Sequence, residues 1–286
     1  LRDMNNPITP CLWFDNKAKE AAAFYSKHLK HAKILSQNPV VTEIEVDGEK
    51  IVLLDGGPVY QPNPSISLFY MVDTPKEIAQ LWEEFSYEGS ILAPLDKYDF
   101  SEKYGWLIDK YGISWQFCLG DIREVGQRIT PFFTFAAQQY GKAEEALNFY
   151  SEIFKNSKID GILRYGKNEA PEQEGTIKHA QVALNTKKVM FMDSVQYPKF
   201  QFTEGVSLII HCESQSEIDY YWEKLTQHGE ESMCGWLKDK YGVSWQVIPV
   251  MLSELMSNPE KSGKAAQAFL QMRKLDIEKI VQATLQ

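Results

Sequence analysis

The chain has 286 residues, which is enough for about two domains of average size. Its formal net charge of −9 disfavours a nucleic-acid binder or an electrostatic membrane-surface protein, because both need basic surface. Hydrophobic residues make up 44% and charged residues 24%, as is typical of a globular protein with a sizeable core. The sequence has no run of about 18 apolar residues and no apolar segment at its N-terminus, so we expect a cytoplasmic protein with neither a membrane span nor a secretory signal.

In chain order, the first predicted elements are a strand at residues 8–14 and a helix at 17–29, whose apolar side chains recur on one face. Residues 40–46 and 50–54 alternate apolar and polar side chains on either side of Asp47-Gly48, a pair typical of tight hairpin turns. We therefore predict that the chain begins with a strand, a helix and a hairpin.

The next predicted elements are a buried strand at 66–72 and a helix that begins at Pro75, with Thr74 as its N-cap. In the second half of the chain, Ser214 is followed three residues later by Glu217, which is the pattern of a capping box. A corresponding helix is therefore predicted to begin there.

The tail of the chain, from about residue 250, is predicted to be helical. Residues 264–273 and 276–285 each carry apolar side chains at helical spacing. We expect these two helices to pack across a domain or subunit seam.

Internal repetition is the most informative feature of the sequence. The nine residues Asp109–Phe117 recur as Asp239–Val247 with seven identical positions. Further motifs recur in the same order: Ile-Thr-Pro at 8 and 129, Phe-Tyr-Ser at 24 and 149, Ser-Leu at 67 and 207, and Gly-Trp-Leu at 105 and 235. This predicts two homologous domains, residues 1–124 and 125–286, the second ending in the helical tail at about 250–286.

A doubled βαβββ unit with Lys-Tyr-Gly-Ile-Ser-Trp-Gln at 110–116 resembles the vicinal oxygen chelate superfamily of glyoxalases, bleomycin-resistance proteins and dioxygenases. Ile-Thr-Pro-x-x-x-Phe at 8–14 and the Gly-Trp-Leu and Ser-Trp-Gln motifs are similar to its PhnB-like family, often labelled 3-demethylubiquinone-9 3-methyltransferase. The resemblance covers almost the whole chain. It implies an α+β fold of two tandem glyoxalase-like domains, each built of paired βαβββ units that form a half-open barrel, plus the C-terminal helices.

The resemblance also implies where a metal would bind. The superfamily's metal enzymes hold a divalent ion with three strand residues, usually two histidines and a glutamate. Carried over by motif, these positions are Ile8 or Thr9, Ser67 and Gln116 in the first repeat, and Ile129 or Thr130, Ser207 and Gln246 in the second. Hydroxyl and amide groups are weak metal ligands compared with imidazole and carboxylate, so we predict no catalytic metal and no cofactor.

Other chemistries also lack their sequence signals. No glycine-rich loop follows a strand and opens a helix, which disfavours methyl transfer from S-adenosylmethionine. The widely spaced cysteines, at 11, 118, 212 and 234, are expected to be free buried thiols.

A cavity inside each half-open barrel is the remaining candidate site, because strand residues alternate between its inside and outside. Gln116 and Gln246 should face inward, whereas Trp115 and Trp245 should point into the core. The candidate ligand-binding residues are Thr9, Ser67, Trp106, Ser114, Gln116, Thr130, Ser207, Trp236, Ser244 and Gln246. The candidate polar anchors are Asp55, Asp193 and His211, of which the two aspartates also fit a turn-capping role.

These observations leave three functions open. In the first, the chain binds a small molecule in a barrel cavity without a metal, and its fused repeats imitate the homodimer of single-copy relatives. In the second, it is a metal-dependent lyase, isomerase or dioxygenase with a non-standard site. In the third, the C-terminal helices dock a partner. We expect no nucleic-acid or membrane partner, and a homodimer through the C-terminal helices is a further expectation.

Overall fold

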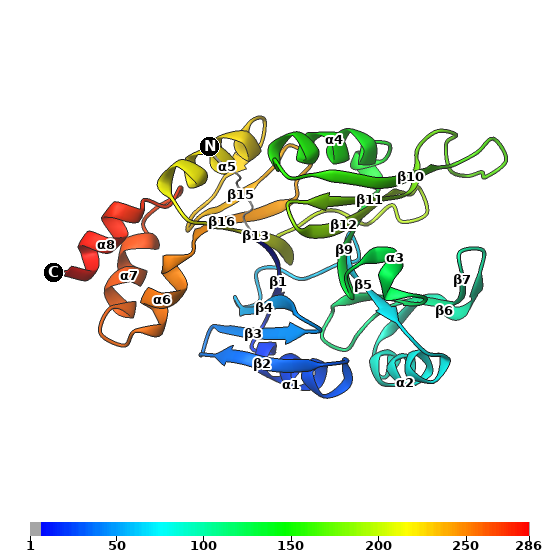
Figure 1. Ribbon diagram of the computed structural model, residues 1–286, viewed down its shortest axis with the longest axis horizontal. Helices are drawn as coiled ribbons and strands as arrows, with labels where there is room; N and C mark the ends of the chain where they lie inside the picture. The colour runs from blue at the N-terminus through cyan, green and yellow to red at the C-terminus, as the bar shows by residue number, and fades with distance from the viewer. Residues whose placement is uncertain (1–6, 286) are drawn as a thin grey trace.

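The computed structural model describes residues 7–285, and the chain folds into two mixed eight-stranded sheets with helices on their outer faces (Figure 1). Residues 1–6, where the sequence predicts no secretory signal, and residue 286 lie outside the described part. Within residues 7–285, no helix has the length and apolar character needed to cross a membrane.

Sheet A has the strand order β14-β15-β16-β13-β1-β4-β3-β2. Its strands from the first repeat are β1 (Ile8–Phe14), β2 (Ala32–Gln37), β3 (Val41–Val46) and β4 (Glu49–Asp55). Its strands from the second repeat are β13 (Val206–Cys212), β14 (Glu230–Glu231), β15 (Trp236–Lys238) and β16 (Ser244–Pro249). Sheet A therefore combines the first half of one repeat with the second half of the other.

Sheet B contains the complementary halves in the order β10-β11-β12-β9-β5-β8-β7-β6. The first repeat supplies β5 (Ile66–Val72), β6 (Ser90–Tyr98), β7 (Ser101–Ile108) and β8 (Ser114–Leu119). The second repeat supplies β9 (Ile129–Phe135), β10 (Lys158–Arg164), β11 (Ile177–Leu184) and β12 (Lys187–Asp193).

Two antiparallel strand pairs join the repeats. β1 pairs with β13, which places Thr9 opposite Ile209, and β5 pairs with β9, which places Phe69 opposite Thr130. Each sheet therefore spans the predicted boundary between residues 124 and 125. The two half-open barrels are built across the repeats, and neither consists of one repeat alone.

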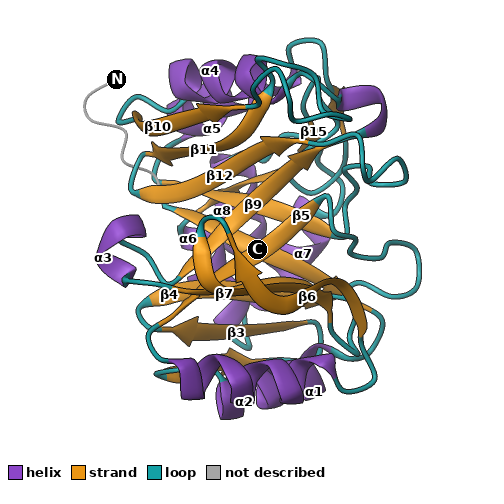
Figure 2. Cartoon of the chain, turned by 90° about the vertical axis from the view of Figure 1, so that its right-hand side faces the viewer, coloured by secondary structure: helices purple, strands orange, loops and turns teal. Residues whose placement is uncertain are grey.

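Helices cover the convex faces of the sheets, and the main hydrophobic core lies between the two layers. Figure 2 shows α4 and α5 on one side of the stacked strands and α1 and α2 on the other. The helices are α1 (Ala18–His28), α2 (Pro75–Ser86), α3 (Ile122–Val125), the 3-10 helix η1 (Ala137–Gln139), α4 (Ala143–Ile153), α5 (Gln215–Thr226), α6 (Met251–Ser257), α7 (Ser262–Phe269) and α8 (Ile277–Leu285).

The turn, the helix caps and two of the strands that the sequence predicts are present in the structure. Asp47 and Gly48 both adopt positive φ, at 51° and 87°, as a tight hairpin turn between β3 and β4 requires. Thr74 and Ser214 cap α2 and α5, and each hydroxyl accepts a hydrogen bond from the backbone N–H three residues on. Two predicted strands, 8–14 and 66–72, correspond residue for residue to β1 and β5.

Edge strands are the elements that the sequence did not locate. β2 and β10 are exposed along almost their whole length, so their side chains show no alternation between core and solvent. The β6–β7 hairpin occupies a segment that is longer in the first repeat, where the second repeat has only the short strands β14 and β15. A strand that meets solvent on both faces leaves little hydrophobic pattern to recognise.

The C-terminal tail is helical as predicted, and it lies at one end of sheet A rather than between the two sheets (Figure 1). The backbone N–H of Cys234 donates to the carbonyl of Met272 at 2.7 Å. Gln215 Nε2, on α5, donates to the carbonyl of Leu275 at 3.1 Å. Both contacts join the tail to the second repeat. A small core of its own contains Leu252, Ala265, Leu275 and Ile280.

Ion pairs join the two sheets. Arg128, only 4% exposed, donates from Nε to Asp47 of sheet A at 2.5 Å and from a terminal nitrogen to Asp73, after β5, at 3.0 Å. Lys187 of sheet B is 5% exposed and pairs with Glu49 of sheet A. Glu49 and Lys187 begin the matching strands β4 and β12, so one matched position carries opposite charges in the two repeats.

The Lys187–Glu49 pair should be a stability determinant. K187E would place a carboxylate at a buried position beside the half-buried carboxylate of Glu49, and we expect a loss on the order of 3 kcal/mol in the free energy of unfolding, measured with urea. The charge-reversed double variant E49K/K187E should regain most of that loss. If K187E unfolds at the same urea concentration as the wild type, the pair does not stabilise the junction.

Candidate functional site

Strand alternation divides β8 and β16 between the core and the concave faces. Trp115 and Trp245 have no exposed surface, as predicted. Trp115 contacts the rings of Tyr25 on α1 and Phe85 on α2, each at a centroid distance of 5.2 Å. The residues on either side of these tryptophans therefore face the inside of the half-open barrels.

A buried aspartate fixes each of these strands. Asp239 accepts hydrogen bonds from Tyr150 OH at 2.6 Å and Trp245 Nε1 at 2.9 Å, and from two backbone amides of the turn before β16. Asp109 makes the same contacts in the first repeat. Burial raises the pKa of Asp239 to about 6 and also raises the pKa of Asp109. These bonds hold the Asp-Lys-Tyr-Gly turn against the helix layer and so orient the strand that follows.

The raised pKa of Asp239 predicts a pH dependence of stability. Because the folded pKa of about 6 lies above the usual value near 4, the stabilising effect of this carboxyl is complete below about pH 4 and is lost as the pH rises through 6. D239N removes the titration and should destabilise the fold by about 1–3 kcal/mol through its lost acceptor. In urea unfolding between pH 4 and 7.5, the difference in the free energy of unfolding between the wild type and D239N should become smaller as the pH rises. A difference that does not change with pH would contradict the raised pKa of Asp239.

On sheet A, β1 brings Thr9 beside the candidate residues of the second repeat. Gln246 Nε2 donates to Ser207 Oγ at 3.0 Å, and Ser207 lies next to Ser244 in the β13–β16 register. Trp236 is the cross-strand partner of Gln246. The structure therefore collects Thr9, Ser207, Trp236, Ser244 and Gln246 on one concave face.

On sheet B, the candidates of the first repeat are completed by Thr130 rather than by Thr9. Ser67 Oγ and Ser114 Oγ are 3.0 Å apart, and Trp106 Nε1 donates to Ser114 Oγ at 2.7 Å. Trp106 lies opposite Gln116 in the β7–β8 pair. Each concave face therefore takes its first-strand threonine from the other repeat.

The two concave faces differ in side-chain size. Three matched positions carry Phe132, Met190 and Phe69 on sheet B, but Cys11, Val52 and Ile209 on sheet A. On sheet B, the rings of Phe69 and Phe132 stack at a centroid distance of 6.3 Å, and Tyr104 and Trp106 belong to the same cluster. The chain's own side chains therefore fill sheet B's concave side more fully than sheet A's.

Two of the candidate polar anchors are helix caps. Asp55 Oδ1 accepts the backbone N–H groups of residues 17 and 18 at 2.9 and 3.0 Å, at the start of α1. Asp193 accepts the N–H groups of residues 141 and 143, at the start of α4, and that of residue 177. Both carboxylates therefore stabilise helix N-termini, and the capping role that the sequence allowed replaces the role of ligand anchor.

His211 is the candidate anchor that lies on a concave face. Its Nε2 is 3.0 Å from Thr9 Oγ1, a contact that again crosses the repeats. Burial lowers the pKa of this imidazole, and the nearby Lys50 lowers it further. His179 lies on sheet B beside the ring of Phe132, at a centroid distance of 5.8 Å. The two histidines therefore belong to different faces.

Comparison with known proteins identifies the family. The family model described as 3-demethylubiquinone-9 3-methyltransferase matches residues 6–118 and again residues 127–248. The chain belongs to this family. It carries the family's unit twice in tandem, in agreement with the internal repeat. Among curated proteins, none matches the chain.

Solved structures place this family unit in a wider fold. The PhnB protein of Bacillus cereus is 32% identical and covers 39% of this chain and 98% of its own, with a TM-score of 0.37. A Pseudomonas aeruginosa protein is 23% identical and covers 39% of this chain and 95% of its own, with a TM-score of 0.33. Glyoxalase I from Zea mays is 11% identical but covers 89% of this chain and 97% of its own, with a TM-score of 0.57. The chain therefore has the predicted tandem glyoxalase-like fold.

The donors on the concave faces do not fit the metal site that the superfamily implies. On sheet A, the donors at the inferred ligand positions are two hydroxyls and an amide, with the imidazole of His211 beside them. On sheet B, they are two hydroxyls and an amide. Three ligands of imidazole and carboxylate type are needed for a typical divalent site. Within residues 7–285, no three His, Cys, Asp or Glu side chains are grouped to hold a metal ion.

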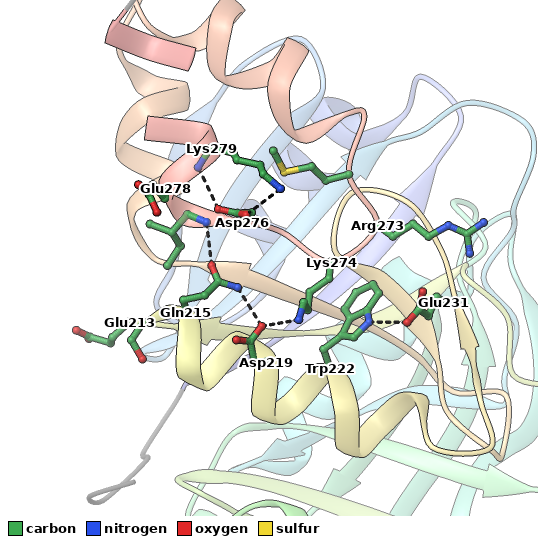
Figure 3. Close-up of a pocket in the computed structure, with 13 residues that line it drawn as sticks. Glu213, Gln215, Asp219, Trp222, Glu231, Arg273, Lys274, Asp276, Glu278 and Lys279 are labelled. Carbon is green, nitrogen blue, oxygen red and sulfur yellow. Dashed lines mark hydrogen bonds and ion pairs between the residues drawn. The ribbon is translucent and has the colours of Figure 1, made fainter. Parts of the chain in front are cut away.

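A hollow of about 1020 Å³ lies outside both concave faces, between α5 and the segment 272–279 (Figure 3). Lys274 reaches across it to Asp219 at 2.6 Å, and Trp222 Nε1 donates to Glu231 at 2.9 Å. No motif in the sequence predicts this hollow. The amphipathic tail was its only signal, and amphipathicity indicates that a helix packs without showing what it packs against.

The reactivity of the four cysteine thiols tests which of them are buried. Cys11, Cys118 and Cys212 are buried and free, whereas Cys234 is partly exposed, so the expectation of burial holds for three of four. Burial raises the pKa of Cys11 to about 11. Partial burial also raises the pKa of Cys234, but its thiol is partly exposed, so at pH 8 Ellman's reagent should react with Cys234 first and with the other thiols only after denaturation. C234S should lose this first reaction, and labelling of the folded C234S variant would show that the reagent reaches a thiol that is buried here.

Proposed function

We propose that the chain binds a small, largely uncharged molecule on the concave face of sheet A, without a catalytic metal. The observation that carries this proposal is the polar group Ser207, Ser244 and Gln246 beside small apolar side chains. Ser244 Oγ is buried and has no hydrogen-bond partner among the described residues. A hydroxyl left unpaired on a concave face is a group that a ligand can satisfy.

The rest of the face supports a ligand that combines apolar or aromatic surface with hydrogen-bonding groups. Cys11, Val52 and Ile209 provide the apolar part. Trp236 and Trp13 meet edge to face at a centroid distance of 5.9 Å at the side of this surface. Hydroxyl and amide groups recognise neutral donors and acceptors, and aromatic rings favour flat apolar groups.

Two alternatives are less well supported. A lyase, isomerase or dioxygenase of this superfamily would need a metal, and the hydroxyl and amide donors described above fit one poorly. The family's description names a methyltransferase, but the sequence has no glycine-rich loop between a strand and a helix of the kind that common S-adenosylmethionine enzymes use. Binding without chemistry is therefore our first proposal.

Native mass spectrometry of the purified protein tests this proposal. We expect an organic molecule bound to the wild type and to Q116A, and at least tenfold weaker binding to Q246A, because Gln246 belongs to the polar group on sheet A. Q116A is a matched control, since Gln116 occupies the same position on sheet B. A bound divalent ion, or an adduct that Q246A retains fully, would contradict the proposal. The melting temperature of Q246A should stay near that of the wild type.

The oligomeric state and location belong to the same proposal. Val250, Met256, Leu270 and Leu285 are exposed apolar side chains in the C-terminal part of the chain, which supports a homodimer through that part. The same native spectra report it, and a monomer at micromolar concentration argues against it. Free thiols are typical of proteins in a reducing compartment, which supports a cytoplasmic location.

A further inference from the structure

The loop 195–201, which we name the plug loop, places two aromatic rings against the concave face of sheet B. The rings of Tyr197 and Phe200 stack on each other at a centroid distance of 4.6 Å with an interplanar angle of 3°. Both meet the ring of Trp106 edge to face, at 4.9 Å for Tyr197 and 5.9 Å for Phe200. Trp106 is therefore covered by rings from a loop that lies far from it in sequence.

The plug loop is held at its two ends. At one end, the backbone N–H of Val195 donates to the carboxylate of Glu172, 3.2 and 3.1 Å from its two oxygens. At the other end, the carbonyl of Gln201 accepts from Asn63 Nδ2 and Ser65 Oγ, each at 2.9 Å.

Ring contacts rather than polar bonds hold the middle of the plug loop. Residues 196, 198 and 199 are exposed. Among the described residues, neither aromatic side chain of the loop makes a side-chain hydrogen bond, although Phe200 N–H donates to the carbonyl of Tyr197 at 3.0 Å. Within residues 7–285, therefore, the contacts between Trp106 and the middle of the loop are ring contacts alone, and neither anchor depends on them.

An unsatisfied polar group lies beside Trp106. Gln116 is 2% exposed and lies opposite Trp106 in the β7–β8 pair. Its Oε1 accepts from Tyr104 OH at 2.8 Å, but its Nε2 has no hydrogen-bond partner among the described residues. A buried amide donor beside an aromatic face suits a ligand that brings a carbonyl oxygen to the amide and a flat ring to the tryptophan.

We propose that the concave face of sheet B is a second ligand site, closed by the plug loop. Tyr197 and Phe200 occupy the place of a flat aromatic ligand that carries a carbonyl oxygen, and such a ligand displaces them. It stacks against Trp106 and accepts a hydrogen bond from Gln116 Nε2. This site lies on a different sheet from the one in the proposed function and does not depend on it.

Acetophenone, an aromatic ring with one carbonyl, tests the site by isothermal titration calorimetry on the full chain. Y197A/F200A should bind it at least tenfold more tightly than the wild type does, because no internal rings need to be displaced. Adding Q116L to that background should lower the acetophenone affinity at least tenfold, whereas binding of toluene, which lacks the carbonyl, should not change. Equal affinity of the wild type and Y197A/F200A, or no effect of Q116L, overturns the proposal.

Matched variants separate this site from its surroundings. Tyr60 contacts Trp13 at a centroid distance of 5.0 Å on the sheet A side, so Y60A should not produce the gain in acetophenone affinity expected of Y197A/F200A. Because acetophenone also has the chemistry proposed for the sheet A face, all titrations are made in a Q246A background, where a gain from Y197A/F200A reports the sheet B site alone and the two proposals can fail separately. Near-UV circular dichroism checks that the variants are folded. If Y197A/F200A is not folded, F200A alone should give a smaller gain in acetophenone affinity, and the absence of any gain contradicts the proposal.

Discussion

The antiparallel pairing of β1 with β13 and of β5 with β9 is the constraint on which the rest of the structure depends. Both strands of each pair are central, so their backbone groups must find partners inside the sheet. By pairing across the repeats, the chain builds two sheets that each need both halves of the sequence. The concave-face contacts that cross the repeats follow from this exchange, including the 3.0 Å contact between Thr9 and His211.

Fusion of two units in one chain allows matched positions to diverge. In a symmetric homodimer both copies carry the same residue, so a pair like Glu49 and Lys187 would bring equal charges together. Here the two positions carry opposite charges and form a partly buried ion pair. The concave faces diverge in the same way, because sheet B carries Phe69 and Phe132 where sheet A carries smaller side chains. One face is thus closed by its own rings, and the other retains small polar and apolar groups.

Neighbouring residues of the same strand face different surroundings, because one packs against the helix layer and the next lies on a concave face. Trp245 packs into the helix layer and donates to Asp239, whereas Gln246, the next residue, joins the polar group on sheet A. The repeated turn and the Ser-Trp-Gln sequence therefore serve stability and the candidate site together. A change in the buried aspartate would act on the site through strand position, without touching a ligand.

By itself, the sequence determined the repeat, the fold, the hairpin at Asp47-Gly48, the caps at Thr74 and Ser214 and the burial of Trp115 and Trp245. These features depend on local backbone preferences and on alternation within one strand, which the residues display directly. Only the tertiary structure decided that Thr9 lies with Ser207 and Gln246, that Asp55 and Asp193 cap helices, and that Tyr197 and Phe200 cover Trp106. Those outcomes depend on which strands pair and on where loops return, and two nearly equivalent repeats leave both choices open until the whole core is packed.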